Sequence, residues 1–124
     1  SESAFRSALA KGQSRDGIYV YEKAGELVGW LWIEYSAAGA AHIRQLQVQQ
    51  AHWGRGLGRQ ILNDALALSA ARGCHAITLN VTKSNARAMA LYEHCGFVMT
   101  RDDGARQRMR LELTDPLEDA DTGQ

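Results

Sequence analysis

Apolar and polar residues alternate along three short segments in the first half of the chain. Residues 18–22 and 27–35 alternate in this way and are rich in β-branched and aromatic residues, which is typical of half-buried β-strands. The four residues between them, Lys23-Ala-Gly-Glu26, read as a hairpin turn. Residues 42–48 alternate again, so the pattern predicts two antiparallel strands followed by a third.

The spacing of apolar residues changes to that of a helix after residue 56. Apolar residues form one stripe over residues 57–68, and Gly73 is a suitable helix end. A compact apolar strand over residues 76–81 follows. The order strand, loop, helix, strand over residues 43–81 therefore predicts a β-α-β crossover.

The last part of the chain predicts one more helix and one more hairpin. Ser84 or Asn85 can cap the helix, and Gly96 can end it in the left-handed conformation. Strands over residues 97–101 and 107–113 would then pair with each other. The fold class we expect is α/β, with a mixed, partly antiparallel sheet and helices on both faces.

The two ends of the chain give weaker signals. Apolar residues at helical spacing predict a short helix over residues 3–11, which Gly12 would end. Residues 114–124 contain four acidic residues and no basic residue, which predicts a solvated, disordered tail. A chain of 124 residues is the size of one domain, which we place at residues 1–113.

Charge and composition exclude several classes of function. Lys and Arg together number 14, as do Asp and Glu, so no global charge favours nucleic acid or an anionic membrane. The sequence has neither eighteen consecutive apolar residues nor the pattern of a signal peptide, so we expect a cytoplasmic protein. Cys74 and Cys95 lack the spacing of metal ligands, and we expect reduced thiols and no metal.

A glycine-rich segment joins the third predicted strand to the first predicted helix. Residues 53–58 read Trp-Gly-Arg-Gly-Leu-Gly. Glycines let the backbone approach a ligand closely, and the free N–H groups at a helix N-terminus bind anions. The sequence therefore predicts a phosphate cradle made by Gly54, Arg55, Gly56, Leu57, Gly58 and Arg59.

Dinucleotide-binding proteins also use glycine-rich turns, so a nucleotide-dependent oxidoreductase is an alternative interpretation. Their pattern requires an early strand and an acidic residue about twenty positions after the turn. Ala and Leu stand at those positions here, which disfavours this alternative.

A second segment brings an amide and a phenol to one side of a helix. Asn85, Ala88 and Tyr92 are spaced by three, four and seven residues, and these steps return to the same helical face. Both polar side chains would then point into one cleft.

Together the two segments resemble the GNAT superfamily of acyl-CoA-dependent N-acetyltransferases. The family motif Asn-x-x-Ala-x-x-x-Tyr-x-x-x-Gly-Phe matches in full from Asn85 to Phe97. The pyrophosphate motif Arg/Gln-x-x-Gly-x-Gly/Ala matches at Gly56 and Gly58, but Trp53 replaces its first residue. The resemblance covers roughly residues 18–113.

The resemblance implies acetyl-CoA as co-substrate and direct transfer to a primary amine in a ternary complex. In this family the pantetheine arm lies along a strand that corresponds here to Leu46, Gln47 and Val48, and backbone N–H groups polarise the thioester oxygen. The family also implies that Tyr92 is the general acid for the leaving sulfur, with packing in the core as the alternative. Asn85 would bind the cofactor arm, cap the helix, or do both.

The resemblance also points to a base for the amine proton. In the arylalkylamine N-acetyltransferases a histidine six residues before the corresponding valine helps remove this proton, and the residue here is His42. With an ordinary pKa of ~6.5, a histidine is mostly neutral at cytoplasmic pH. Arg44 stands where that subfamily has its second histidine, Glu34 is a competing base, and an ordinary surface histidine is the third option.

Other side chains have both a functional and a structural interpretation. Trp30, Trp32 and Glu34 share one strand face, where they either wall a pocket for an aromatic or cationic amine or pack in the core. Lys83, Arg87 and Arg101 either meet the ribose 3′-phosphate of CoA or are solvated surface residues.

The region before the first hairpin is shorter than in the family. One strand and two helices normally precede the hairpin, and seventeen residues are available here. A trimmed domain, a segment of a longer chain, and a partner that completes the sheet, such as a second copy in a homodimer, all stay open. The main functional alternative is a non-catalytic acyl-CoA-binding or regulatory module, and the acceptor could be a metabolite, a drug, a polyamine or a protein amino group.

Overall fold

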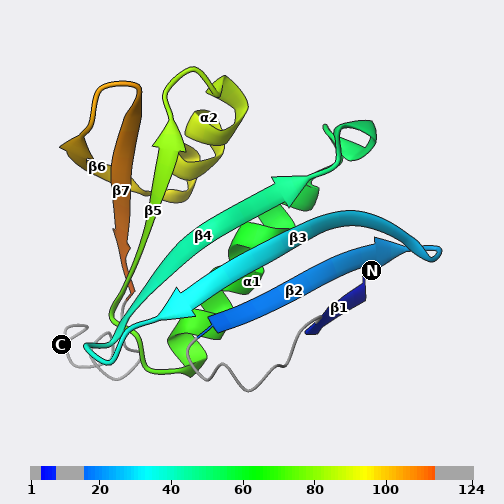
Figure 1. Cartoon of the computed structure of the whole chain (residues 1–124), viewed down its shortest axis with the longest axis horizontal. Coiled ribbons are helices and arrows are strands. Elements are labelled where there is room, and N and C mark those ends of the chain that lie inside the picture. Colours follow the sequence, from blue (N-terminus) through cyan, green and yellow to red (C-terminus); the bar gives the residue numbers. More distant parts are fainter. Residues whose placement is uncertain (1–3, 8–15, 114–124) are drawn as a thin grey trace, which may run out of the picture.

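The computed structural model describes residues 4–7 and 16–113, which form one seven-stranded sheet and two α-helices (Figure 1). In spatial order the strands are β1-β2-β3-β4-β5-β7-β6. Neither described helix is long and apolar enough to cross a membrane. The elements in chain order are β1 (Ala4–Ser7), β2 (Asp16–Lys23), β3 (Glu26–Tyr35), β4 (Ala40–Val48), the short 3₁₀ helix η1 (Gln50–His52), α1 (Leu57–Ala71), β5 (Ala76–Thr82), α2 (Ala86–Cys95), β6 (Val98–Asp102) and β7 (Arg106–Glu112).

The strand pairing confirms the predicted mixed α/β fold. Strands β1 to β4 pair in sequence as antiparallel neighbours, and β4 pairs with β5 in parallel. Helix α1 connects β4 to β5, so the predicted β-α-β crossover is confirmed. Strand β7 inserts between β5 and β6 and is antiparallel to both, which confirms the C-terminal hairpin.

Both described helices pack on the same face of the sheet. A Cβ placed on Gly29 of β3 would lie 3.0 Å from Ile61 of α1, so Gly29 faces that helix. A Cβ on Gly96, which ends α2, would lie 3.3 Å from Leu111 of β7. The strand register places both contacts on one side, where the most deeply buried residues are Tyr21, Val28, Leu31, Ile33, Ile61, Leu62, Ile77, Leu79 and Met109.

The expectation of helices on both faces is therefore wrong for the described residues. The opposite face carries Glu34, His42, Arg44 and Arg108, which alternate along their strands with the core residues. Trp30 and Trp32 lie on the same side of β3 as Glu34, so this face is apolar near β2 and β3 and charged near β4, β5 and β7. We call it the open face.

The start of the chain also differs from the prediction. Residues 4–7 form strand β1 instead of a helix, and they pair with residues 19–22 of β2. The free backbone edge of β2 offers hydrogen bonds that outweigh a weak local helix preference. The remaining residues of the predicted helix, and the predicted acidic tail over residues 114–124, lie outside the described residues.

Strands β4 and β5 pair over only four residues each and then separate. Residues 40–43 of β4 pair with residues 76–79 of β5, and neither strand pairs with the other beyond that point. Figure 1 shows the two strands together near the start of β5 and spreading apart towards α2. The remainder of β4 therefore has an unpaired edge that faces a gap in the sheet.

Candidate active site

Two cavities border consecutive stretches of β4. One has a volume of about 550 Å³ and lies on the side of the helices, and we call it the helix-side cavity. The other, of about 720 Å³, lies on the open face, and we call it the open-face cavity. The helix-side cavity is lined by residues that include Leu46, Gln47, Val48, Gly56, Gly58, Arg59, Asn85, Arg87 and Tyr92. The lining of the open-face cavity includes Glu34, His42, Arg44, Thr78, Asn80, Arg106 and Arg108.

Helix α1 begins directly after the glycine turn, and no side chain caps its N-terminus. Gly54 and Gly56 have φ angles of 78° and 81°, which strongly favour glycine, and a Cβ at either position would meet nothing within 4 Å. Gly56 is the N-cap, no side chain bonds the free amides there, and the first turn has no acidic residue. Free N–H groups and the positive end of the helix dipole therefore face the helix-side cavity, as a phosphate cradle requires.

The six residues of the predicted cradle are not equivalent. Gly56, Gly58 and Arg59 line the cavity, whereas Gly54 and Arg55 do not. Leu57 is buried in the core, 8% exposed, so it can offer a ligand only its backbone N–H. The predicted cradle would therefore rest mainly on backbone groups and not on a pair of arginine side chains.

The unpaired edge of β4 presents backbone groups of alternate residues. The amide of Gln49 donates to the carbonyl of Val28 on β3 at 2.9 Å. Because the backbone groups of successive residues point to opposite edges of a strand, this bond determines which edge each residue of β4 faces. Backbone groups of Gln47 therefore face β3, and those of Leu46 and Val48 face the gap. Of the three residues predicted along the cofactor arm, Leu46 and Val48 have backbone groups that face the gap, whereas Gln47 does not.

Trp53 lies at the end of the unpaired edge of β4 and bonds to its last residue. Its indole N–H donates to the carbonyl oxygen of Val48 at 2.9 Å, and the guanidinium of Arg87 lies 4.8 Å from the centre of its ring. Trp53 therefore holds a cation at the mouth of the helix-side cavity, although it replaces the Arg or Gln of the motif. The other two candidate phosphate ligands are occupied, because Lys83 pairs with Asp102 at 2.6 Å and Arg101 pairs with Asp103 at 3.0 Å.

Helix α2 carries the predicted amide and phenol into the helix-side cavity. The side chain of Asn85 accepts a hydrogen bond from the amide of Ala88 at 3.2 Å, so its capping role is confirmed. Tyr92 is buried against Phe97, with ring centres 5.8 Å apart, and burial raises the pKa of its phenol to about 12. No hydrogen bond joins its hydroxyl to another described residue, and this leaves the proton free for a ligand.

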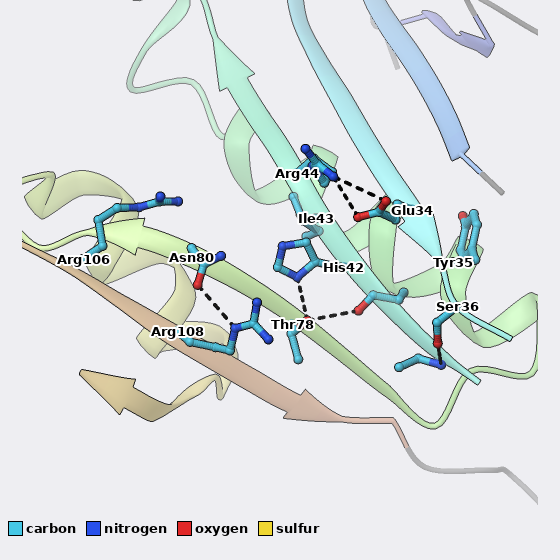
Figure 2. Close-up of a pocket in the computed structure, with 12 residues that line it drawn as sticks. Glu34, Tyr35, Ser36, His42, Ile43, Arg44, Thr78, Asn80, Arg106 and Arg108 are labelled. Carbon is cyan, nitrogen blue, oxygen red and sulfur yellow. Dashed lines mark hydrogen bonds and ion pairs between the residues drawn. The ribbon is translucent and has the colours of Figure 1, made fainter. Parts of the chain in front are cut away.

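His42 lies near the centre of the open-face cavity (Figure 2). Its Nδ1 lies 2.7 Å from the hydroxyl oxygen of Thr78, and that hydroxyl donates to the carbonyl of Ala41 at 3.4 Å. This arrangement favours the tautomer with the proton on Nδ1 and a free electron pair on Nε2.

The surroundings of His42 favour its neutral form. Burial lowers its pKa below the ordinary 6.5, and the positive charge of Arg108 lowers the pKa further. Arg44 and Arg106 act in the same direction, whereas Glu34 opposes them. His42 is therefore neutral and able to accept a proton at pH 7.

Glu34, the competing base, is engaged by Arg44. The guanidinium Nη1 lies 3.2 and 3.4 Å from the two carboxylate oxygens. The same guanidinium lies 4.9 Å from the centre of the Trp32 ring. Arg44 thus takes the position that a cationic amine would occupy if Trp32 and Glu34 walled a pocket, as one of the two interpretations had it.

The sequence motifs did not predict four residues of the open-face cavity, namely Thr78, Asn80, Arg106 and Arg108. Their signal in the sequence is the alternation of polar residues with core residues along residues 77–81 and 106–110. The pairing of β5 with β4 places Thr78 and Asn80 on the face that carries His42. The insertion of β7 beside β5 then adds Arg106 and Arg108 to that face.

Comparison with known proteins agrees with the geometry. The model of the acetyltransferase (GNAT) family matches residues 2–97. The chain belongs to the GNAT family. The resemblance drawn from the two motifs is thereby confirmed.

Several members of this family are similar to the chain. A mycothiol acetyltransferase from Beutenbergia cavernae is 42% identical over 73 residues, which cover 59% of this chain and 25% of that protein. A streptothricin acetyltransferase from Streptomyces lavendulae is 33% identical over 82 residues, covering 65% and 43% of the two chains. A spermidine N-acetyltransferase from Vibrio cholerae, solved with CoA and spermine, has a TM-score of 0.70 at 27% identity, covering 80% of this chain and 66% of that chain. The chain spans less than half the length of the two curated relatives.

The electrostatics of the open-face cavity can be tested by NMR titration of the His42 ring. We expect a pKa below 6.5, and Arg108→Gln should raise this pKa because it removes a nearby positive charge. Arg110→Gln is the matched control, since Arg110 is on the same strand but is paired with Glu112 and does not line the cavity. A His42 pKa at or above 6.5 in the unmodified chain would contradict this description.

Proposed function

We propose that this chain is an acetyl-CoA-dependent N-acetyltransferase that transfers the acetyl group directly to a primary amine. The observation that carries the proposal is the pair of cavities on opposite faces of the sheet beside the point where β4 and β5 separate. One cavity has the features that bind an acyl-CoA, and the other has a neutral base. Membership of the GNAT family, and relatives named acetyltransferases, support the same reaction.

Acetyl-CoA would supply a diphosphate and an activated thioester carbonyl. The uncapped N-terminus of α1 would bind the diphosphate, with Arg59 and Arg87 as additional cations. The backbone groups of Leu46 and Val48 would bind the pantetheine arm as an added strand would, and one of their N–H groups would polarise the thioester oxygen.

His42 is the base that we propose for the amine. An ammonium group must lose one proton before its nitrogen attacks, and Nε2 of a neutral histidine can accept that proton directly or through a water. Glu34 is the weaker candidate because its carboxylate is already bonded to Arg44. The lowered pKa of His42 places the acid limb of the rate profile below pH 6.5, where protonation removes the base.

Tyr92 is the group that we propose for the leaving sulfur. As the C–N bond forms and the C–S bond breaks, the nitrogen loses its second proton and the sulfur gains one. A phenol with a pKa of about 12 keeps its proton at neutral pH, so Tyr92 acts first as a hydrogen-bond donor to the sulfur. The phenol proton is transferred once negative charge has built up on the sulfur.

The reaction and the role of Tyr92 can be tested together by measuring thiol release from acetyl-CoA with a panel of primary amines. The unmodified chain should release CoA in an amine-dependent way. Tyr92→Phe keeps the ring against Phe97 and removes the donor, so its kcat should fall roughly 10²-fold while CoA affinity stays close to normal.

The matched control removes a different buried hydroxyl. Tyr21 donates to Asp64 in the core at 2.7 Å and lines neither cavity, so Tyr21→Phe should reduce stability and leave kcat unchanged. CoA binding without thiol release for any amine would favour the non-catalytic module. An unchanged kcat in Tyr92→Phe, with chemistry rate-limiting, would assign Tyr92 to the core alone.

The Trp53–Arg87 pair gives a separate prediction for cofactor binding. Arg87→Gln should weaken CoA binding about tenfold, since a hydrogen bond to a charged group contributes roughly 1.5–3 kcal/mol. Lys83→Gln should have little effect because Lys83 is paired with Asp102. Titration calorimetry of both variants checks this, and equal losses in both would show that Arg87 has no specific role.

A further inference from the structure

The open-face cavity has an excess of positive charge. Of the described residues that line it, three carry a guanidinium group, Arg44, Arg106 and Arg108, and one carries a carboxylate, Glu34. That carboxylate is paired with Arg44. Arg106 and Arg108 form no ion pair with any described residue, so their charge is available to a ligand.

Arg108 is held in a position that suits recognition of an anion. It is half-buried, and its Nε donates to the side-chain oxygen of Asn80 at 3.4 Å, which orients the guanidinium over β5 (Figure 2). This contact leaves the two terminal nitrogens free, and they can bind a carboxylate or a phosphate through two parallel hydrogen bonds.

The cavity is unsuited to a second cation. Among the described residues that line it, Glu34 is the only acidic one, and Arg44 is bonded to Glu34 and lies over the face of Trp32. A polyamine or another substrate with a second positive charge would have to displace Arg44 and then face Arg106 and Arg108. The arrangement therefore selects against cationic acceptors.

We propose that the acceptor of this enzyme is a small amine that carries an anionic group, a carboxylate or a phosphate, bound by Arg108 and Arg106 while the amino group lies at His42. The proposal rests on the function proposed above and names the class of its acceptor.

The strand register supports this placement. His42 lies opposite Thr78 on β5, Arg108 lies opposite Asn80, and Arg106 lies opposite Thr82. At about 3.3 Å per residue, Arg108 and Arg106 lie roughly 7 and 13 Å farther along the sheet than His42. The cavity volume of about 720 Å³ is sufficient for a small molecule that reaches from His42 to Arg108.

Matched pairs of amines test the proposal in the full chain. One pair is an ω-amino acid and its amide, another is an amino sugar phosphate and the unphosphorylated sugar, and spermidine is the cationic member. We expect kcat/KM to be at least about tenfold higher for the anionic member of one or both pairs, mainly through KM. The two pairs distinguish a carboxylate from a phosphate.

Two variants connect the preference to the proposed residues. Arg108→Gln should abolish most of the preference by raising KM for the anionic member, with little change for its neutral partner. Arg110→Gln removes a charge from the same strand and face but leaves the cavity lining intact, so the preference should persist. If the chain acetylates both amines of each pair at equal rates, or acetylates spermidine faster, the proposal of an anionic acceptor is wrong. The proposed acetyltransferase function would stand in either case.

A binding measurement decides the anion site independently of turnover. Inorganic phosphate should raise the pKa of His42 in an NMR titration, because an anion beside Arg108 offsets the positive charges of Arg108, Arg106 and Arg44. Arg108→Gln should reduce this response and Arg110→Gln should not. If phosphate leaves the His42 titration unchanged, or acts equally on both variants, the anion site is wrong. Absence of turnover with a positive phosphate response would contradict the proposed function alone.

Discussion

The separation of β4 and β5 is the feature on which the candidate site depends. The strands pair over residues 40–43 and 76–79 and then spread apart, so β4 keeps an unpaired edge inside the sheet. Unpaired backbone groups in a sheet are costly unless water or a ligand satisfies them. Helices α1 and α2 approach each other below the gap, where a Cβ on Gly58 would lie 3.5 Å from Leu91. The open edge thus lies between the cavity among the helices and the cavity on the opposite face.

The two faces of the sheet have different chemistry because both helices lie on one of them. On the helix side, the core ends at a cavity with free helix amides and a buried phenol. On the open face, polar positions of β3, β4, β5 and β7 gather charged groups around a neutral histidine. In the proposed function, the acyl donor and the acceptor amine would therefore approach the same gap from opposite sides.

Local patterns in the sequence predicted most of this architecture, and long-range packing decided the rest. Alternation and helical spacing predicted β2 to β7 and both helices, and the glycine turn predicted the free N-terminus of α1. The weak pattern over residues 3–11 was overridden at residues 4–7 by pairing with β2. The roles of Arg44 and Arg108 could not be predicted, because one depends on cross-strand contacts with Glu34 and Trp32 and the other on the insertion of β7 beside β5.

Amide hydrogen exchange of β4 with and without CoA tests the central claim most directly, since it reports on the unpaired edge itself. In the free chain the amides of Leu46 and Val48 should exchange fast, and the amide of Gln47, which faces β3, should be protected. Added CoA should slow exchange at Leu46 and Val48 and leave Gln47 unchanged. Slow exchange at Leu46 and Val48 before CoA is added, or CoA protection confined to the N-terminus of α1, would contradict the account.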